Sequence, residues 1–305
     1  MFGFRKARAP LTTFQRVDIE LLMRKTVETL GLPFIRSVDV VVDLAQLELD
    51  TSSQERLISS AEDRVRDYLP TMEASCRTRI VQASDAAYPS VYKAASDNET
   101  ALIQITDETV GDPLRTVIEL AYQYSSHYWH TRPDGSELYR HPRTTHLLPI
   151  CCGLGVLASD ACLYDDQWSR GGWTGWSISR SGYYSTVEVG YALSLFARAR
   201  GEQNPEWAKK LRLDSLATAR QAAKYFDVHL EQGGSLLFEA ETVPSSSADL
   251  SQLARWLEGE DKSFALAAGF ALAKLDELSP RAAEAALTAS RSGDPDLVPV
   301  AARLL

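Results

Sequence analysis

The pattern of hydrophobic and polar positions predicts helices and short strands over the first part of the chain. Apolar residues recur at helical spacing over residues 11–32, and the β-branched run 36–44 predicts a strand. Residues 52–69 carry one apolar stripe and begin with Ser52 and Glu55 at the spacing of a capping box. They are therefore expected to form an amphipathic helix.

Two further strands and two long helices follow, and their order indicates the fold class. Apolar runs predict strands at 76–83 and 101–106, with the polar, loop-like segment 85–99 between them. Helical spacing predicts helices at 114–129 and 144–164, on either side of a turn rich in proline and glycine. Because the expected strands all lie in the first third, the sequence predicts an α+β fold: a small N-terminal sheet with helices, then a mostly helical core.

A polar linker divides the remaining chain into two expected domains. Helices are expected at 186–200 and from Pro205 to about residue 230, ahead of the serine-rich segment 241–249. The change of composition at this segment predicts one α+β domain over 1–240 and a short helical C-terminal extension over 241–305. The end of the extension has the Asp-Pro turn and apolar spacing of one HEAT-like helical-repeat unit.

Composition and charge limit the classes of partner. The chain has 305 residues, 45% of them hydrophobic, and a net charge of −9, which is typical of a globular protein. An acidic chain disfavours nucleic acids and anionic membranes, because phosphate groups need a basic surface. No apolar run reaches the roughly 18 residues of a transmembrane helix, and the four cysteines lack the spacing of a disulfide scaffold. We therefore expect a cytoplasmic protein with reduced cysteines, binding neither nucleic acid nor membrane.

Four of the five histidines lie in one short window, between two of the expected helices. His127 and His130 share a face of the first helix, and His141 and His146 follow across the turn. Many metallohydrolases assemble a metal site from imidazoles on such a helix pair. These four histidines, with Gln123 beside them, are therefore the candidate ligands of a divalent metal such as zinc.

The chain carries a series of motifs downstream of this window. They read GLGV at 153–156, WSISRSGY at 176–183, YALSLFA at 191–197 and RGEQNPEW at 200–207. Over residues 144–213 the chain resembles a family of bacterial proteins with a gluzincin-like zinc metallopeptidase core. In that family a His-Glu-x-x-His helix precedes a second helix with an acidic-Thr-Asp signature. The resemblance implies a zinc-binding helix pair and peptidase chemistry, and the N-terminal third matches only in the order of its elements.

The first helix departs from the His-Glu-x-x-His pattern in either of two registers. In the first register, Gln123 replaces the first histidine, Tyr124 replaces the glutamate and His127 remains as the second histidine. In the second register, over residues 118–122, Glu119 keeps the glutamate position and both histidines are lost. The flanking His-Tyr-Trp fits the first register better, so we prefer it.

The departures from the motif predict that peptidase chemistry is lost. On the second helix, His146 stands where the family has aspartate, and no glutamate lies at the expected ligand position near Pro142. A tyrosine, with a pKa of about 10, does not replace the glutamate as a general base near neutral pH. We therefore expect a catalytically inactive metallopeptidase-like protein, a pseudoenzyme, that acts by binding a protein or peptide.

Two alternatives stay open. A rearranged histidine set could hold a metal and support a metal-dependent hydrolase, or the chain is a structural helical adaptor in which Tyr122 and Tyr124 fill the former metal position. The aromatic residues over 168–184 either pack on the core helices or form a platform for a peptide or sugar. Arg180 could pair with a buried acid such as Asp160.

Overall fold

The computed structural model describes two compact units of the chain. One unit comprises Leu30–Arg220, and the other combines Met1–Thr29 with Gln221–Leu305. The described residues are 8–70, 75–95, 100–132, 142–170, 173–231, 247–259, 265, 268–269, 272, 278–294 and 297–305.

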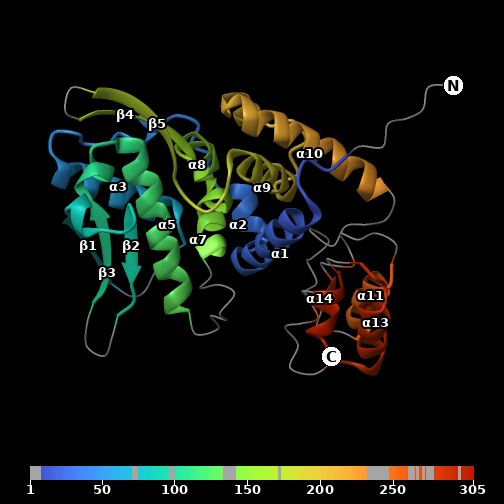
Figure 1. Ribbon diagram of the computed structural model, residues 1–305. Helices are drawn as coiled ribbons and strands as arrows, with labels where there is room; N and C mark the ends of the chain where they lie inside the picture. Colours follow the sequence, from blue (N-terminus) through green and yellow to red (C-terminus); the bar gives the residue numbers. More distant parts are fainter. Residues whose placement is uncertain are drawn as a thin grey trace. The chain divides into compact units, whose positions relative to one another are not determined.

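A three-stranded sheet of mixed direction lies in the larger unit (Figure 1). Its strands are β1 (Cys76–Val81), β2 (Ser90–Lys93) and β3 (Ala101–Thr106), in the order β1-β3-β2. β1 runs parallel to β3, and β2 pairs antiparallel with it. Side chains alternate between the two faces of a strand, so Ile103 and Ile105 are fully buried on the inner face, whereas Leu102 and Gln104 are half-buried on the outer face.

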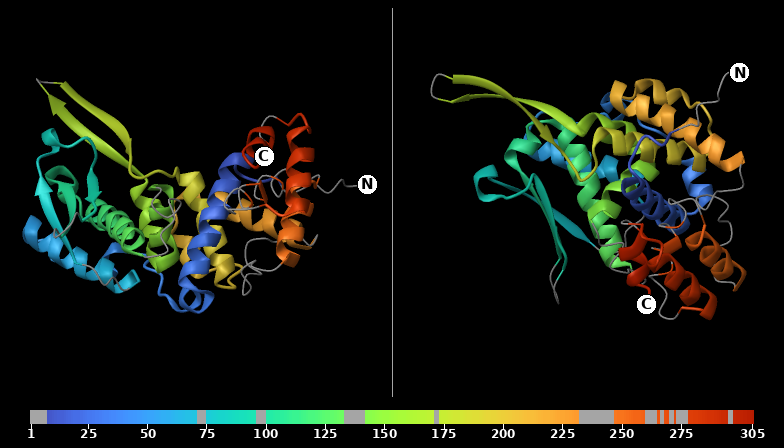
Figure 2. Two further views of the ribbon diagram at one scale, coloured as in Figure 1. Left: turned by 90° about the horizontal axis from the view of Figure 1, so that it is seen from below. Right: turned by 45° about the vertical axis from the view of Figure 1, so that its right-hand side comes forward.

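Two amphipathic helices share a hydrophobic core with the inner face of the sheet (Figure 2). The first, α3 (Gln54–Tyr68), begins at Ser53, whose hydroxyl accepts the Arg56 N–H. After the short helix α4 (Asp107–Val110), the second, α5 (Pro113–Thr131), begins at Asp112. The Asp112 carboxylate accepts two backbone N–H groups of the first turn, which would otherwise lack partners. This capping fixes where α5, the helix with most of the candidate residues, begins.

The next helical segment is interrupted for a steric reason. Helix α7 (Pro142–Pro149) continues through a π-helical turn, η3 (Ile150–Leu154), into α8 (Gly155–Ala161). Within that turn Gly153 has a φ of 87°, and a Cβ at this position would lie 2.0 Å from the carbonyl oxygen of Asp39. The Val41 N–H donates to the Gly153 carbonyl at 2.9 Å. Only glycine allows both the left-handed backbone and this close approach.

A hairpin and further helices complete the larger unit. The hairpin joins β4 (Leu163–Arg170) to β5 (Trp173–Arg180), and Figure 2 shows it as a long ribbon that projects from the helices. The remaining elements are α2 (Leu32–Ser37), η1 (Leu44–Leu47), η2 (Ala83–Asp85), α9 (Thr186–Ala199), η4 (Glu206–Lys210) and the start of α10 (Leu213–Glu231).

The motif at 200–207 stabilises the segment that follows α2. The Arg200 guanidinium donates to the carbonyl oxygens of Ile35 and Val38 at 2.8 and 2.6 Å. Glu202 accepts from the guanidinium of Arg200 at 2.9 Å and from the indole N–H of Trp207 at 2.8 Å. Arg, Glu and Trp at this spacing therefore hold a loop in place, and their role here is structural.

The smaller unit is helical in its described part. It contains most of α1 (Thr13–Leu30), the end of α10, α11 (Ser247–Leu257), α13 (Pro280–Ser290) and α14 (Leu297–Ala302). The Arg16 guanidinium lies 4.8 Å from the ring centre of Tyr225. Helices α11, α13 and α14 share a separate core rich in alanine and leucine, including Ala254, Ala285 and Val300.

The α+β class, with a small sheet and mostly helical remainder, is confirmed. The expected strand at 36–44 is wrong: this segment is extended only in part, and its carbonyls and N–H groups bond to Arg200 and to the Gly153 turn instead of a neighbouring strand. The expected loop 85–99 contains β2, a four-residue edge strand too short to show alternation.

Three more expectations are wrong in the later elements. Strands also occur beyond the first third, because β4 and β5 pair antiparallel as a hairpin. The single helix at 144–164 is broken at Gly153. The long helix does not begin at Pro205: a 3-10 turn comes first, and extended backbone at Leu211 separates it from α10.

Two boundaries also differ from expectation. The N-cap of α3 is Ser53, because Ser52 instead bonds to the carboxylate of Asp50. The domain boundary at 241–249 stays a prediction, since 241–246 lie outside the described residues, while contacts divide the chain after Thr29 and after Arg220.

Candidate functional site

Glu119 of α5 is the centre of a buried polar network. Its carboxylate accepts the hydroxyl of Ser90, on β2, and the hydroxyl of Ser181, which follows β5, each at 2.5 Å. The side-chain amide of Gln123, one turn further along α5, donates to the Ser90 oxygen at 2.7 Å. Only 5% of Glu119 is exposed. The network therefore joins α5 to β2 and to the end of the hairpin.

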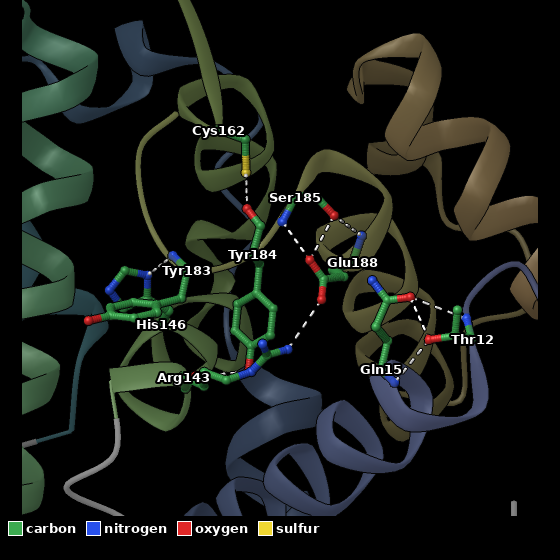
Figure 3. A network of polar contacts seen from close by, with 9 residues as sticks. All are labelled: Thr12, Gln15, Arg143, His146, Cys162, Tyr183, Tyr184, Ser185 and Glu188. Carbon is green, nitrogen blue, oxygen red and sulfur yellow. Dashed lines mark hydrogen bonds and ion pairs between the residues drawn. The ribbon is translucent and has the colours of Figure 1, made fainter. Parts of the chain in front are cut away.

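His146 of α7 is buried against the ring of Tyr122. The two rings are stacked, with centroids 3.6 Å apart and planes 8° from parallel. The backbone N–H of Tyr183 donates to Nδ1 of His146 at 3.2 Å (Figure 3). Burial lowers the pKa of His146 from 6.5 to about 3, so the imidazole is neutral at physiological pH.

The loop Ser181–Tyr183 links these two groups. Ser181 donates to Glu119, and the next two residues cover His146. Gly182 has a φ of 82°, and a Cβ on it would lie 2.9 Å from Nδ1 of His146. Burial, together with nearby groups that include Glu119, also raises the pKa of Tyr122. Glu119, Tyr122 and His146 thus surround one loop.

A second group of candidates faces strand β2. The Tyr92 hydroxyl lies 3.1 Å from Nδ1 of His127, and its ring centroid lies 5.6 Å from that of His127 and 5.1 Å from that of His130. Nδ1 of His130 donates to the carbonyl of Ser126, one turn earlier, at 2.8 Å. Burial raises the pKa of Tyr92 to about 12. This group therefore packs an aromatic ring between α5 and the sheet edge.

Tyr124 extends toward α3, away from both groups. Its hydroxyl donates to Glu62 at 2.9 Å and accepts from the guanidinium of Arg66 at 2.6 Å. The hydroxyl of Thr78, on β1, also donates to Glu62. Burial and the Glu62 carboxylate raise the pKa of Tyr124. The phenol thus connects α5 to α3.

Arg143 fixes the start of α7 against α9. Its guanidinium donates to Glu188 at 3.2 Å and lies 4.7 Å from the ring centre of Tyr184 (Figure 3). The Tyr184 hydroxyl in turn donates to the Arg143 carbonyl at 3.0 Å. Glu188 and Ser185 form a capping box at the start of α9. These contacts set the position from which His146 reaches Tyr122.

The candidate ligands that the structure describes are not gathered around one point as a zinc ion would require. Among the described residues, no three side chains of His, Cys, Asp or Glu lie together as a metal ion would require. His146 and His127 lie in different groups, and Nδ1 of His146 already accepts a backbone N–H. His141 lies outside the described residues. Gln123 bonds to Ser90.

The sequence did not indicate which side chains contact these candidate residues. Ser90 and Tyr92 lie in a segment expected to be a loop, so nothing in the pattern connected them to α5. Ser181 and Gly182 do lie within the WSISRSGY motif, which was a usable signal. The side chains of Arg180 and of the tryptophans in the aromatic cluster at 168–184 lie outside the described ones. Tyr183 and Tyr184 of that cluster pack against His146 and Arg143.

Comparison with known proteins identifies no relative: no protein-family model, no curated protein and no solved structure matches the chain. In the part of the chain that the structure describes, no helix has both the length and the apolar character to cross a membrane. All four cysteines are free thiols, and three of them are buried.

Proposed function

We propose that this chain is a metallopeptidase-like protein that has lost catalysis and acts by binding a protein or peptide. The stacked pair of Tyr122 and His146 carries the proposal. In a His-Glu-x-x-His helix the two imidazoles lie one turn apart and hold the metal. With Glu119 in the glutamate position, Tyr122 replaces the second imidazole and its ring lies flat on the one histidine of α7.

The state of the candidate general bases supports the same proposal. A general base must reach a water or substrate proton. Both carboxylate oxygens of Glu119 accept serine hydroxyls in a buried site. Tyr124, the candidate of the other register, has a raised pKa and is bonded to Glu62. Both groups are therefore engaged by neighbouring side chains and do not face a water or a substrate.

The free thiols also support a cytoplasmic location, because a reducing compartment keeps cysteines unpaired. Cys151 and Cys152 are buried, and burial raises the pKa of both thiols. They are small core residues in this reading, with no chemical role.

Metal analysis of the purified protein tests the proposal. After dialysis against zinc and then buffer, the natural chain is expected to hold far less than one zinc per molecule by mass spectrometry. Stoichiometric zinc that disappears in His127→Ala and in His146→Ala would instead establish a working histidine site, and with it the alternative of a metal-dependent hydrolase.

Two designed variants test whether the chain derives from a His-Glu-x-x-His metallopeptidase. Ile118→His with Tyr122→His restores His-Glu-x-x-His around Glu119, whereas Gln123→His with Tyr124→Glu builds the same motif ending at His127. We expect the first variant to gain zinc beside His146 and the second to gain none. Circular dichroism checks that each variant is folded. If only the second variant gains zinc, the register that ends at His127 is favoured over the one around Glu119.

A structural adaptor is the second candidate function, and one observation favours it. Tyr122 is buried in the space between α5 and α7, as a filled cleft requires. Tyr124, expected to share that role, instead bonds to α3. An adaptor of this kind predicts that Tyr122→Ala loses stability and leaves partner binding unchanged, provided the variant still folds.

A further inference from the structure

The outer face of the three-stranded sheet carries cations that pair with no acid among the described residues. Side chains alternate along a strand, so Arg77 and Arg79 of β1 and Lys93 of β2 project on the face opposite the core. All three are exposed. Within the described residues, no carboxylate forms an ion pair with any of them, although the whole chain has an excess of acidic residues.

The same face contains a concave site. A cavity of about 530 Å³ is lined by Arg79, Gln104 and Lys93, with Tyr88 at its edge. Tyr88 is 66% exposed, the most exposed aromatic side chain among the described residues. One acid, Asp85, also lines the cavity, and its carboxylate accepts the neighbouring hydroxyl of Ser84.

The strand register sets the spacing of the cations. Arg77 and Arg79 are two residues apart on one strand, which is about 7 Å. Arg77 pairs with Leu102 of β3, and Leu102 pairs with Lys93 of β2, so the lysine lies two strands away, at about 10 Å. Alternate side chains of an extended peptide recur at the same spacing of about 7 Å, and arginine binds carboxylates in a bidentate manner.

We infer that this face binds an acidic peptide segment of a partner protein, in extended conformation, with carboxylates on Arg77, Arg79 and Lys93 and an apolar side chain against Tyr88. The inference rests on the proposed binding function and names its class of partner. Gln104 supplies an amide for the peptide backbone, and Asp85 at the rim disfavours a continuous polyanion. The net charge of −9 repels anions in general, and it opposes a long, uniformly charged nucleic acid far more than a short peptide with a few carboxylates.

Fluorescence anisotropy with a defined probe tests this inference. The probe is a fluorescein-labelled peptide of alternating glutamate and serine with one central leucine, measured at low salt against the full chain. We expect Arg79→Glu with Lys93→Glu to weaken binding by about tenfold or more, which is about 1.4 kcal/mol. The matched control is Arg36→Glu with Lys210→Glu, which makes the same charge change at exposed cations elsewhere in this unit and is expected to shift the dissociation constant less than about twofold.

Three results would overturn the inference. The first is that the acidic peptide does not bind up to about 1 mM. The second is that the sheet-face variant and the control variant weaken binding equally. The third is that single-stranded DNA binds more tightly than the peptide and is equally sensitive to Arg79→Glu. The anisotropy of the labelled peptide does not depend on whether the chain holds zinc. Stoichiometric zinc would reject the loss of catalysis and leave the peptide result standing, and failure of peptide binding would reject only the partner class.

Discussion

Acidification should destabilise the larger unit through His146. The neutral imidazole accepts the Tyr183 N–H at Nδ1 and stacks on the Tyr122 ring. A proton on Nδ1 would place two donors against each other and would bring a charge into a buried site. Burial lowers the pKa of His146 in the folded protein to about 3, whereas the unfolded chain has the ordinary value of 6.5.

The sign of the effect follows from proton binding. Between these two pKa values the unfolded chain binds a proton that the folded protein excludes, so acid favours unfolding. The stability contributed by the neutral form is complete above the unfolded pKa of 6.5 and is lost as the pH falls toward about 3. The free energy of unfolding should fall by about 1.4 kcal/mol for each pH unit in this window, or about 2 kcal/mol between about pH 7.5 and about pH 5.

Urea denaturation at a series of pH values measures this loss, and His146→Phe supplies the control. Phenylalanine keeps a flat ring against Tyr122 but does not titrate. The variant leaves the Tyr183 N–H without its acceptor, which lowers its stability by about 1–2 kcal/mol through a contribution that does not itself change with pH. Other titrating groups contribute equally to both proteins, so the difference between the two pH profiles isolates His146.

Two profiles that run parallel between about pH 7.5 and about pH 5 would contradict a lowered pKa of His146 in the folded protein. Parallel profiles would mean that His146 keeps an ordinary pKa and is open to water. A nuclear magnetic resonance titration of the His146 ring protons gives an independent check, since no inflection is expected near the ordinary pKa of 6.5.

Three further changes should lower stability by different amounts. Gly153→Ala should cost about 3 kcal/mol or more in urea denaturation, because its Cβ meets a backbone carbonyl. Gly201→Ala should cost only about 1 kcal/mol, because Gly201 has a similar φ but open space around it. Equal losses would contradict the steric account. Tyr124→Phe should cost about 1–3 kcal/mol, as read by thermal unfolding, because it removes one hydroxyl from the charged contact with Arg66. It should leave peptide binding unchanged. Arg200→Lys should cost about 1–2 kcal/mol in the same assay, since one ammonium group cannot replace both Nη1, which donates to two carbonyls, and Nε, which donates to Glu202. An unchanged melting temperature would refute that role.

The elements with strong periodicity were predictable from the sequence. The stripe of α3, the strand near 101–106 and the start of α5 at Asp112 all appear in the structure close to the expected bounds. Their patterns are local, because the side chains that face the core recur at the period of the element itself. Glu119 and His146 were named on different grounds, the resemblance to the His-Glu-x-x-His motif and the window of histidines.

The features that the sequence did not reveal depend on distant contacts. Strand β2 is short, and it exists because β3 offers it a partner. The segment 38–41 has a β-branched composition, yet the Gly153 turn and Arg200 take its backbone groups. The serine donors around Glu119 come from two separate segments, so no spacing rule could bring Ser90 and Ser181 together.

The geometry bears on the choice between the two registers of the broken motif. In the preferred register, the ligand positions Gln123 and His127 face β2, but the base position, Tyr124, bonds to α3. In the other register, Glu119 and Tyr122 surround the same loop as the one described histidine of α7. A hydrolytic site needs its base and its ligands around one point, so the contacts favour the register that keeps the glutamate. Under the proposed metallopeptidase-like origin, this register puts Glu119 at the acid position and Tyr122 at the position of the second imidazole.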